Sequence, residues 1–167
     1  MPIKVGDTVC VPSGSLHALL GGSIIAEIQQ NSNTTYRVYD WNRTRDGKAR
    51  PLHIRQALDV INFDQVEPTL PQPQLIADEN QVRRYLLCSN QYFITERVEM
   101  TKGAVFDGLC DGQTLEIWGI LNGRAQVNNV SIEAVQFTLL PAEMGSYQVK
   151  SLSDAVLLRT YVPSPMQ

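Results

Sequence analysis

The sequence predicts an all-β protein, a barrel or sandwich of short strands with one short helix and an extended linker. Apolar and polar residues alternate with period two in many short segments, as in strands that bury one face. Turn residues, chiefly glycine, proline and asparagine, separate these segments. Only one segment, before the middle of the chain, has helical spacing, and a proline-rich stretch follows it.

The first group of strands is expected at the amino-terminal end. Period-two segments predict strands at 5–11, 23–30 and 35–41. The connectors are short and rich in glycine, serine and asparagine, which are turn residues. The aromatic side chains of the third segment are expected in a core, and they are Tyr36, Tyr39 and Trp41.

A helix and a linker are expected next. A polar loop at 42–48 leads to Pro51, whose fixed φ suits the first turn of a helix. His53, at the start of this helix, is expected to face solvent. Residues 64–82 carry three prolines among polar residues and predict an extended, semi-rigid linker. Apolar residues recur at helical spacing between these two points, at Ile54, Ala57, Leu58 and Ile61.

Strands resume after the linker and continue almost to the end of the chain. Their alternation and their glycine-containing turns are typical of a small barrel or sandwich. The expected strands are 85–88, 92–100, 113–121, 123–130, 134–140, 145–149 and 155–161.

Composition narrows the class of protein. With 167 residues, 43% of them hydrophobic and 19% charged, the chain is expected to form one domain, or one domain and a fragment. A net charge of −3 without a basic cluster argues against a nucleic-acid partner. No apolar run reaches the roughly 18 residues that span a bilayer, and the first residues do not resemble a secretory signal. Three scattered cysteines indicate reduced thiols, so we expect a cytoplasmic protein without a membrane partner.

One turn has a spacing that suggests metal binding. Gly6 is followed after five residues by Pro12-Ser-Gly14-Ser-Leu-His17, the spacing of the second cupin motif, in which the histidine is a metal ligand in a β-barrel. Gly14 can supply the positive φ of a tight turn, and a neutral imidazole is a common metal ligand. Outside this context, a lone histidine is more often an ordinary structural residue.

A fainter trace of the same fold lies in the second half. Glu116 precedes Gly123 with the spacing found at the end of the first cupin motif, but the His-x-His that should come before it is absent. The turn at 140–147 offers no histidine either. We therefore expect a cupin-like barrel without a metal, with Trp118 and Ile120 in its core.

Together these stretches resemble one family. The segment around His17, Glu27-Ile-Gln-Gln30 and Thr34-Thr-Tyr-Arg37-Val-Tyr-Asp40 are similar to the type I mannose-6-phosphate isomerases of the short bacterial form, over the second half of such a chain. The resemblance implies a cupin-type fold in three parts. These are the closing strands of a truncated catalytic cupin at 1–45, the helix and linker at 46–83, and a metal-free barrel at 84–167.

The resemblance also implies an activity and its residues. The family interconverts mannose 6-phosphate and fructose 6-phosphate through a cis-enediol, with zinc at the substrate oxygens. His17 would be the last zinc ligand, the only one in this chain, and Arg37 the catalytic arginine that also binds substrate. Glu27 and Gln29 would line the substrate pocket, or else lie at the barrel mouth. Strand parity puts Arg37 on one face with Thr35 and Tyr39, although Arg37 could instead pair with Glu27 or Asp40.

Two functional classes remain open from the sequence. The first is an isomerase-family chain that is truncated, binds no stoichiometric zinc by itself and is inactive alone. The alternative is a non-catalytic cupin-like module that binds a sugar phosphate or a protein partner. In either case three strands without their neighbours would expose unpaired edges and an apolar face, so we expect a homodimer formed through the N-terminal strands.

Overall fold

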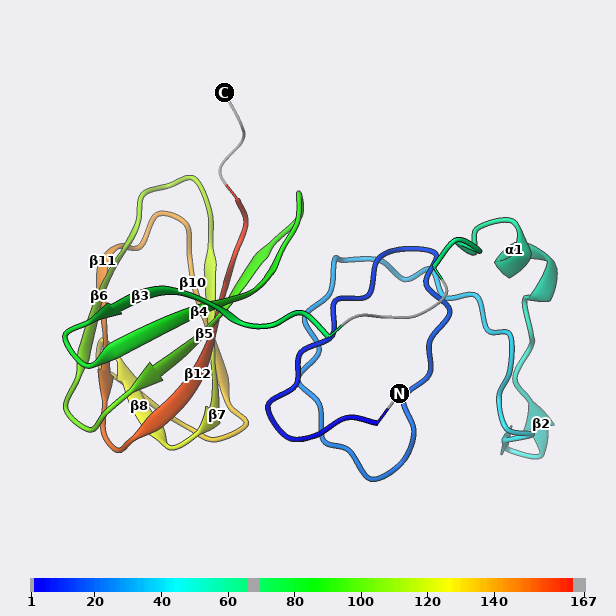
Figure 1. Ribbon diagram of the computed structural model, residues 1–167, viewed down its shortest axis with the longest axis horizontal. Helices are drawn as coiled ribbons and strands as arrows, with labels where there is room; N and C mark the ends of the chain where they lie inside the picture. The colour runs from blue at the N-terminus through cyan, green and yellow to red at the C-terminus, as the bar shows by residue number, and fades with distance from the viewer. Residues whose placement is uncertain (1, 66–69, 164–167) are drawn as a thin grey trace. The chain divides into compact units, whose positions relative to one another are not determined.

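The computed structural model describes residues 2–65 and 70–163, and these form two compact units (Figure 1). Residues 70–163, with residues 2–8, make up the first unit, and residues 9–65 make up the second. Residues 66–69, which belong to the expected linker, lie outside the described residues. No helix within the described residues is long and apolar enough to cross a membrane.

The first unit is a barrel of two antiparallel sheets. One sheet has six strands in the order β10-β7-β12-β5-β4-β3, and the other has four in the order β6-β11-β8-β9 (Figure 1). The strands of this unit are β3 (Gln74–Glu79), β4 (Val82–Ser89), β5 (Ile94–Met100), β6 (Val105–Cys110), β7 (Glu116–Asn122), β8 (Arg124–Val127), β9 (Val130–Glu133), β10 (Phe137–Leu140), β11 (Gly145–Ser151) and β12 (Ala155–Tyr161).

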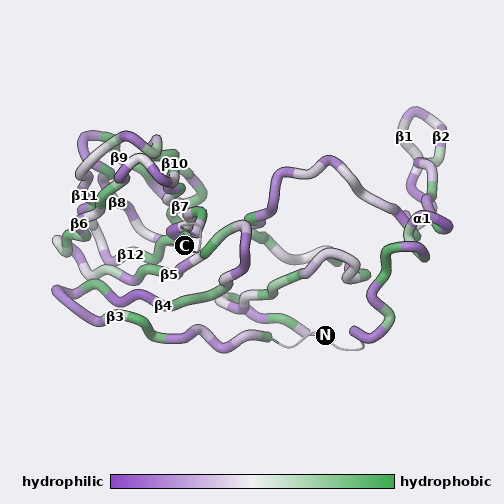
Figure 2. The backbone as a smooth tube through the Cα atoms, turned by 90° about the horizontal axis from the view of Figure 1, so that it is seen from above, coloured by the Kyte–Doolittle hydropathy of each residue, from purple (hydrophilic) through white to green (hydrophobic). Residues whose placement is uncertain are grey.

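One core lies between the two sheets. Hydrophobic and hydrophilic residues alternate along the barrel strands (Figure 2), and in β11 every second residue is buried. Trp118 and Ile120 are fully buried, which confirms their expected place in the core. The core therefore follows directly from the period-two pattern.

Two cross-strand pairs combine a glycine with an aromatic ring. Tyr147 of β11 pairs with Gly108 of β6, and its ring occupies the space that a Cβ at Gly108 would take. Phe137 of β10 covers Gly119 of β7 in the same way. At these positions glycine makes room for a ring that lies flat across the neighbouring strand.

The all-β fold class is confirmed, but three strands of the barrel were missed. β3 lies in the expected linker, β6 in a stretch that contains glycine and aspartate, and β9 begins at the last residue of the expected strand 123–130 and fills the gap before the next one. Residues such as proline, glycine and aspartate are depleted in strands, so local composition concealed the first two. Asn80 and Gln81 both have positive φ and close a tight turn between β3 and β4.

The second unit has little regular structure. It contains the short strands β1 (Thr44–Arg45) and β2 (Lys48–Ala49) and the helix α1 (Ile54–Leu58). The helix was expected, and its Ala57 is buried. The strand pair falls inside the segment that was expected to be a loop.

The three expected N-terminal strands are wrong. The structure has no strand among residues 2–43, and Tyr36, Tyr39 and Trp41 are about half exposed instead of buried. Alternation supplies a strand with two faces, but a strand forms only where a neighbour completes its hydrogen bonds. Nothing in the described part of the chain pairs with these segments in a ladder.

Candidate functional site

Residues 37–53 fold back on themselves through β1 and β2 and lead into helix α1; this segment is called the ribbon, and Arg37 lies at its start. Its backbone carbonyl accepts a hydrogen bond of 2.7 Å from the backbone N–H of His53, and its own N–H donates to Nδ1 of the His53 ring at 3.1 Å. The Arg37 guanidinium donates through Nη1 to the carbonyl of Pro51 at 3.3 Å. Residues 51 and 53 therefore hold Arg37 at both its backbone and its side chain. His53 is half-buried, so the expectation that it faces solvent is wrong.

An ion pair between Asp40 and Arg50 joins the two sides of the same ribbon, three residues after Arg37. Both oxygens of the buried Asp40 carboxylate accept from Arg50, with Nε at 2.7 Å from Oδ2. The Arg50 hydrogen bonds hold the pKa of Asp40 below its ordinary value, against the effect of burial. The ion pair of Asp40 is thus with Arg50 and not with Arg37.

His17 follows a turn that packs against the segment after α1. Gly14 has φ +84°, as expected, and its carbonyl accepts from the N–H of Asn62 at 2.9 Å. A Cβ at Gly14 would lie 2.7 Å from the carbonyl oxygen of Val60, so only glycine fits. The His17 ring is exposed, with Nδ1 2.9 Å from the carbonyl of Ser15. Donation from Nδ1 leaves the Nε2 lone pair available to a metal.

The described residues do not assemble a zinc site around His17. Glu27 and Gln29 are exposed, and no hydrogen bond or ion pair within 2–65 joins them to His17 or Arg37. No group of three or more His, Cys, Asp or Glu side chains in the described part of the chain is close enough to hold a metal ion. Zinc needs at least three protein ligands, so the residues present do not fit it. The roles assigned to these four residues stay predictions.

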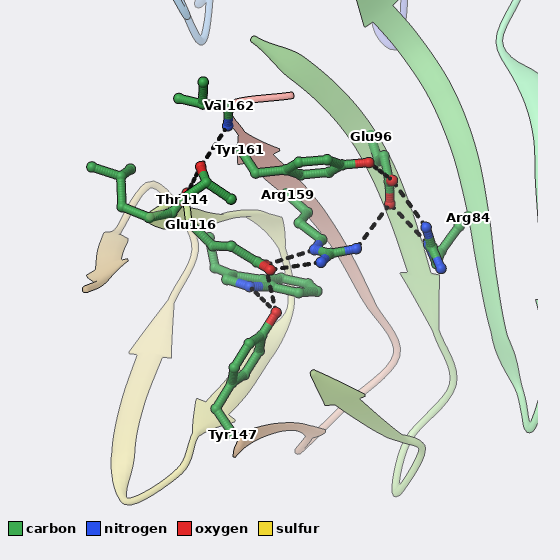
Figure 3. Close-up of polar contacts among 10 residues, drawn as sticks. Arg84, Glu96, Thr114, Glu116, Tyr147, Arg159, Tyr161 and Val162 are labelled. Atoms are coloured by element: carbon green, nitrogen blue, oxygen red, sulfur yellow. Dashed lines mark hydrogen bonds and ion pairs between the residues drawn. The ribbon is translucent and has the colours of Figure 1, made fainter. Parts of the chain in front are cut away.

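A network of buried charges lies inside the barrel (Figure 3). Arg159 donates to both oxygens of Glu116 at 2.7 Å and lies 3.7 Å from Glu96. Arg84 donates to both oxygens of Glu96, at 2.8 and 2.9 Å. Tyr147 donates to Glu116 at 2.5 Å, and Glu96 accepts a further bond of 2.8 Å from Tyr161. The two carboxylates are 0% and 3% exposed, so their charges depend on these donors.

The network sets the protonation of its members. Burial favours a neutral Glu96, but hydrogen bonds from Arg84 and Tyr161 outweigh it and hold the Glu96 pKa below its ordinary value. Burial and the hydrogen bond to Glu96 raise the pKa of Tyr161 to about 12. Burial alone would lower the pKa of Arg159, but the bonds to Glu116 raise it. Glu96 and Arg159 thus remain charged, with opposite signs, at neutral pH.

Aromatic rings surround the central cation of this network. The Arg159 guanidinium lies 5.1 Å from the ring centre of Phe106, 5.9 Å from that of Trp118 and 4.7 Å from that of Tyr161. Glu116, which carries the faint cupin trace in the sequence, therefore binds an arginine. The network stabilises the barrel interior, and all its polar groups are occupied by one another.

Sequence reasoning missed most of these residues. Strand parity offered a signal, because Glu96 shares a strand face with the buried Val98, and Arg159 shares one with the buried Leu157. Charged residues on a core-facing parity must find partners, so their pairing could have been anticipated. The contact between His53 and Arg37 had no such signal, since it depends on where the ribbon meets the helix.

Comparisons with known proteins give the chain its relatives. No protein-family model matches it. A probable mannose-6-phosphate isomerase of Bacillus subtilis, GmuF, is 32% identical over 161 residues, which cover 93% of this chain and 49% of the relative. A mannose-6-phosphate isomerase of Streptococcus mutans is 52% identical over 64 residues, which cover 38% of this chain and 20% of the relative. The chain thus spans about half the length of GmuF, and a smaller share of the other.

The solved structures support the same fold. The crystal structure of mannose 6-phosphate isomerase from Bacillus subtilis aligns with this chain at a TM-score of 0.59 and 18% sequence identity. The aligned part covers 75% of this chain and 39% of the isomerase chain. With its two antiparallel sheets around one core, this protein is a cupin-type barrel protein, the class that its sequence predicted. Within that class, the chain belongs to the mannose-6-phosphate isomerase family.

Proposed function

We propose that this chain contributes to the interconversion of mannose 6-phosphate and fructose 6-phosphate, with Arg37 as its substrate-binding and catalytic arginine. The similarity to GmuF over 93% of the chain carries this proposal. The contacts that hold Arg37 at its backbone and at Nη1 support it, because a positioned guanidinium is what such a site requires.

Arg37 suits the chemistry of this reaction in two ways. Its planar guanidinium can donate two parallel hydrogen bonds to a phosphate. An enediol intermediate develops negative charge on the substrate oxygens, and a fixed cation nearby lowers the energy of the transition state. Glu27 and Gln29 would donate or accept at the sugar hydroxyls.

Binding of mannose 6-phosphate to the full chain tests the role of Arg37. We expect Arg37→Ala to weaken binding, measured by calorimetry or by NMR titration, by about tenfold or more, as for a lost hydrogen bond to a charged group. Arg43→Ala is the matched control, because Arg43 lies on the same ribbon, is exposed and stacks over Trp41 at 5.3 Å. Equal losses in the two variants would remove Arg37 from this role.

The alternative function is a non-catalytic module that binds a sugar phosphate or a protein partner. The lack of a metal-holding group of side chains among the described residues supports this reading, because His17 is then the only zinc ligand proposed there. We propose that the chain alone does not turn substrate over. An isomerisation assay that detects fructose 6-phosphate separates the two functions, since turnover by the purified chain would contradict the inactive state.

Zinc gives a second test of the isolated chain. His17 presents one ligand nitrogen, and a catalytic zinc site takes three protein ligands. We therefore expect metal analysis of the purified protein to find far less than one zinc per chain. About one zinc per chain, lost on His17→Ala, would overturn this expectation.

We also propose that the protein forms a homodimer through its N-terminal segment, in the cytoplasm. Leu19, Leu20 and Ile24 are 62%, 70% and 97% exposed, and apolar side chains gathered in one segment favour association. The three scattered cysteines of the sequence fit a reducing compartment. Light scattering that shows only monomer at high micromolar concentration would contradict the dimer, and Leu20→Asp with Ile24→Asp should weaken it.

A further inference from the structure

We propose that His53 is a positioning residue for Arg37, and that its ring Nδ1 fixes the arginine backbone in the orientation that binds substrate. This inference rests on the proposed function for its consequence, but not for the contact itself. The two residues face each other across the ribbon: Arg37 contributes its backbone N–H and carbonyl, and His53 contributes its backbone N–H and its ring Nδ1.

The carbonyl of His53 explains why a ring nitrogen is needed. Two residues directly opposite in a narrow antiparallel pair normally exchange two backbone hydrogen bonds. Here the N–H of His53 donates to Arg37, but the carbonyl of His53 accepts from the N–H of Ala57 at 2.9 Å, at the start of helix α1. The backbone acceptor is therefore used by the helix, and Nδ1 takes its place for the N–H of Arg37.

This arrangement joins the ribbon to the helix without leaving a polar group unpaired. Nδ1 accepts a hydrogen bond only when the imidazole is neutral and carries its proton on Nε2. The ring is half-buried, and its centre lies 6.2 Å from that of the Tyr36 ring. Few side chains place an acceptor this close to their own backbone, and asparagine is a neutral one whose Oδ1 matches Nδ1.

Loss of the acceptor should release Arg37. The backbone N–H of Arg37 would lose its partner, which leaves only the bond from the His53 N–H to the Arg37 carbonyl and the exposed contact of the guanidinium with Pro51 at 3.3 Å. A guanidinium on a mobile backbone must be ordered when it binds a phosphate, and this ordering reduces affinity. The effect of His53 on binding therefore acts entirely through Arg37.

Amide hydrogen exchange of Arg37, followed by NMR in the full chain without ligand, tests the contact directly. We expect His53→Phe, which keeps a ring but lacks the acceptor, to raise the exchange rate of the Arg37 N–H about tenfold. His53→Asn should restore most of the protection. Tyr36→Leu, which removes the neighbouring ring and keeps Nδ1, is the matched control and should leave the rate near that of the wild type. Equal exchange rates in all four proteins would overturn the proposal.

Mannose 6-phosphate binding then tests the consequence. We expect the affinity to fall about tenfold in His53→Phe and to return within about threefold in His53→Asn. Loss of affinity in both variants alike, with the Arg37 N–H protected in the asparagine variant, would overturn the positioning role.

Two further results keep the inference separate from the proposed function. If the wild type does not bind mannose 6-phosphate, the proposed function fails and the exchange data alone decide the contact. If His53→Phe does not fold, a ¹⁵N–¹⁵N coupling across the hydrogen bond between Arg37 and His53 in the wild type decides it. Its presence supports the contact and its absence refutes it.

Discussion

Replacing Arg159 by methionine would remove the cation that joins the two buried carboxylates of the barrel. Arg159 makes two bonds of 2.7 Å to Glu116 and lies 3.7 Å from Glu96, and these carboxylates are 3% and 0% exposed. Glu116 would keep only the hydroxyl of Tyr147 as a donor. Removal of one partner of a buried pair costs about 3–5 kcal/mol, so we expect a loss of this size in the free energy of unfolding.

Two companion variants divide this effect. Arg84→Met should cost less, about 1.5–3 kcal/mol, because Arg84 is 27% exposed and Glu96 would keep Tyr161 and Arg159. The double variant Arg159→Met with Glu116→Leu also removes the Glu116 carboxylate, so the loss of Arg159 no longer leaves that carboxylate without a cation. We expect it to recover about 1–3 kcal/mol relative to Arg159→Met alone.

Urea unfolding at pH 7 measures these differences. Trp118 is fully buried beside the network and reports on the barrel, while the exposed Trp41 should first be replaced by phenylalanine in every protein compared. A cost below about 1 kcal/mol for Arg159→Met would refute the reasoning. So would a double variant that is no more stable than the single one, because the orphaned carboxylate would then not be the source of the loss.

Three further outcomes follow from the barrel. Gly108→Ala should cost about 1–3 kcal/mol, because its Cβ would overlap the Tyr147 ring, while Gly21→Ala, with open space around it, should be nearly neutral; similar values would contradict this. The Glu96 pKa is lowered in the folded state, so its contribution to the free energy of unfolding is complete above about pH 4.5 and is lost as the pH falls through the folded pKa. The free energy of unfolding should therefore depend less on pH in the acid range for Glu96→Gln than for the wild type. The pKa of Tyr161 is raised to about 12, so its contribution to the free energy of unfolding is complete below about pH 10 and is lost as the pH rises through about 12. An absorbance titration of the tyrosines should therefore show one phenol fewer ionising near pH 12 in Tyr161→Phe.

Period and composition were enough to predict the barrel. Seven of its strands, and its buried Trp118 and Ile120, follow from alternation that is visible in the sequence. β3 and β6 were hidden because β3 follows a proline-rich stretch and β6 includes aspartate and glycine, and they exist because β4 and β11 supply hydrogen-bond partners. The same dependence on partners explains why the alternating segments between 5 and 41 are not strands.

The candidate site shows the same division. The sequence by itself determined the positive φ of Gly14 in the turn before His17 and the helix after Pro51. It also determined the family to which the chain belongs. Tertiary structure alone decided that His53 accepts from Arg37, and that Arg159 lies between two buried glutamates. A turn or a helix needs only the conformational preferences of neighbouring residues, which the sequence states locally. A hydrogen bond between residues 16 or 43 positions apart depends on the register of paired segments, and register is fixed only when the chain folds.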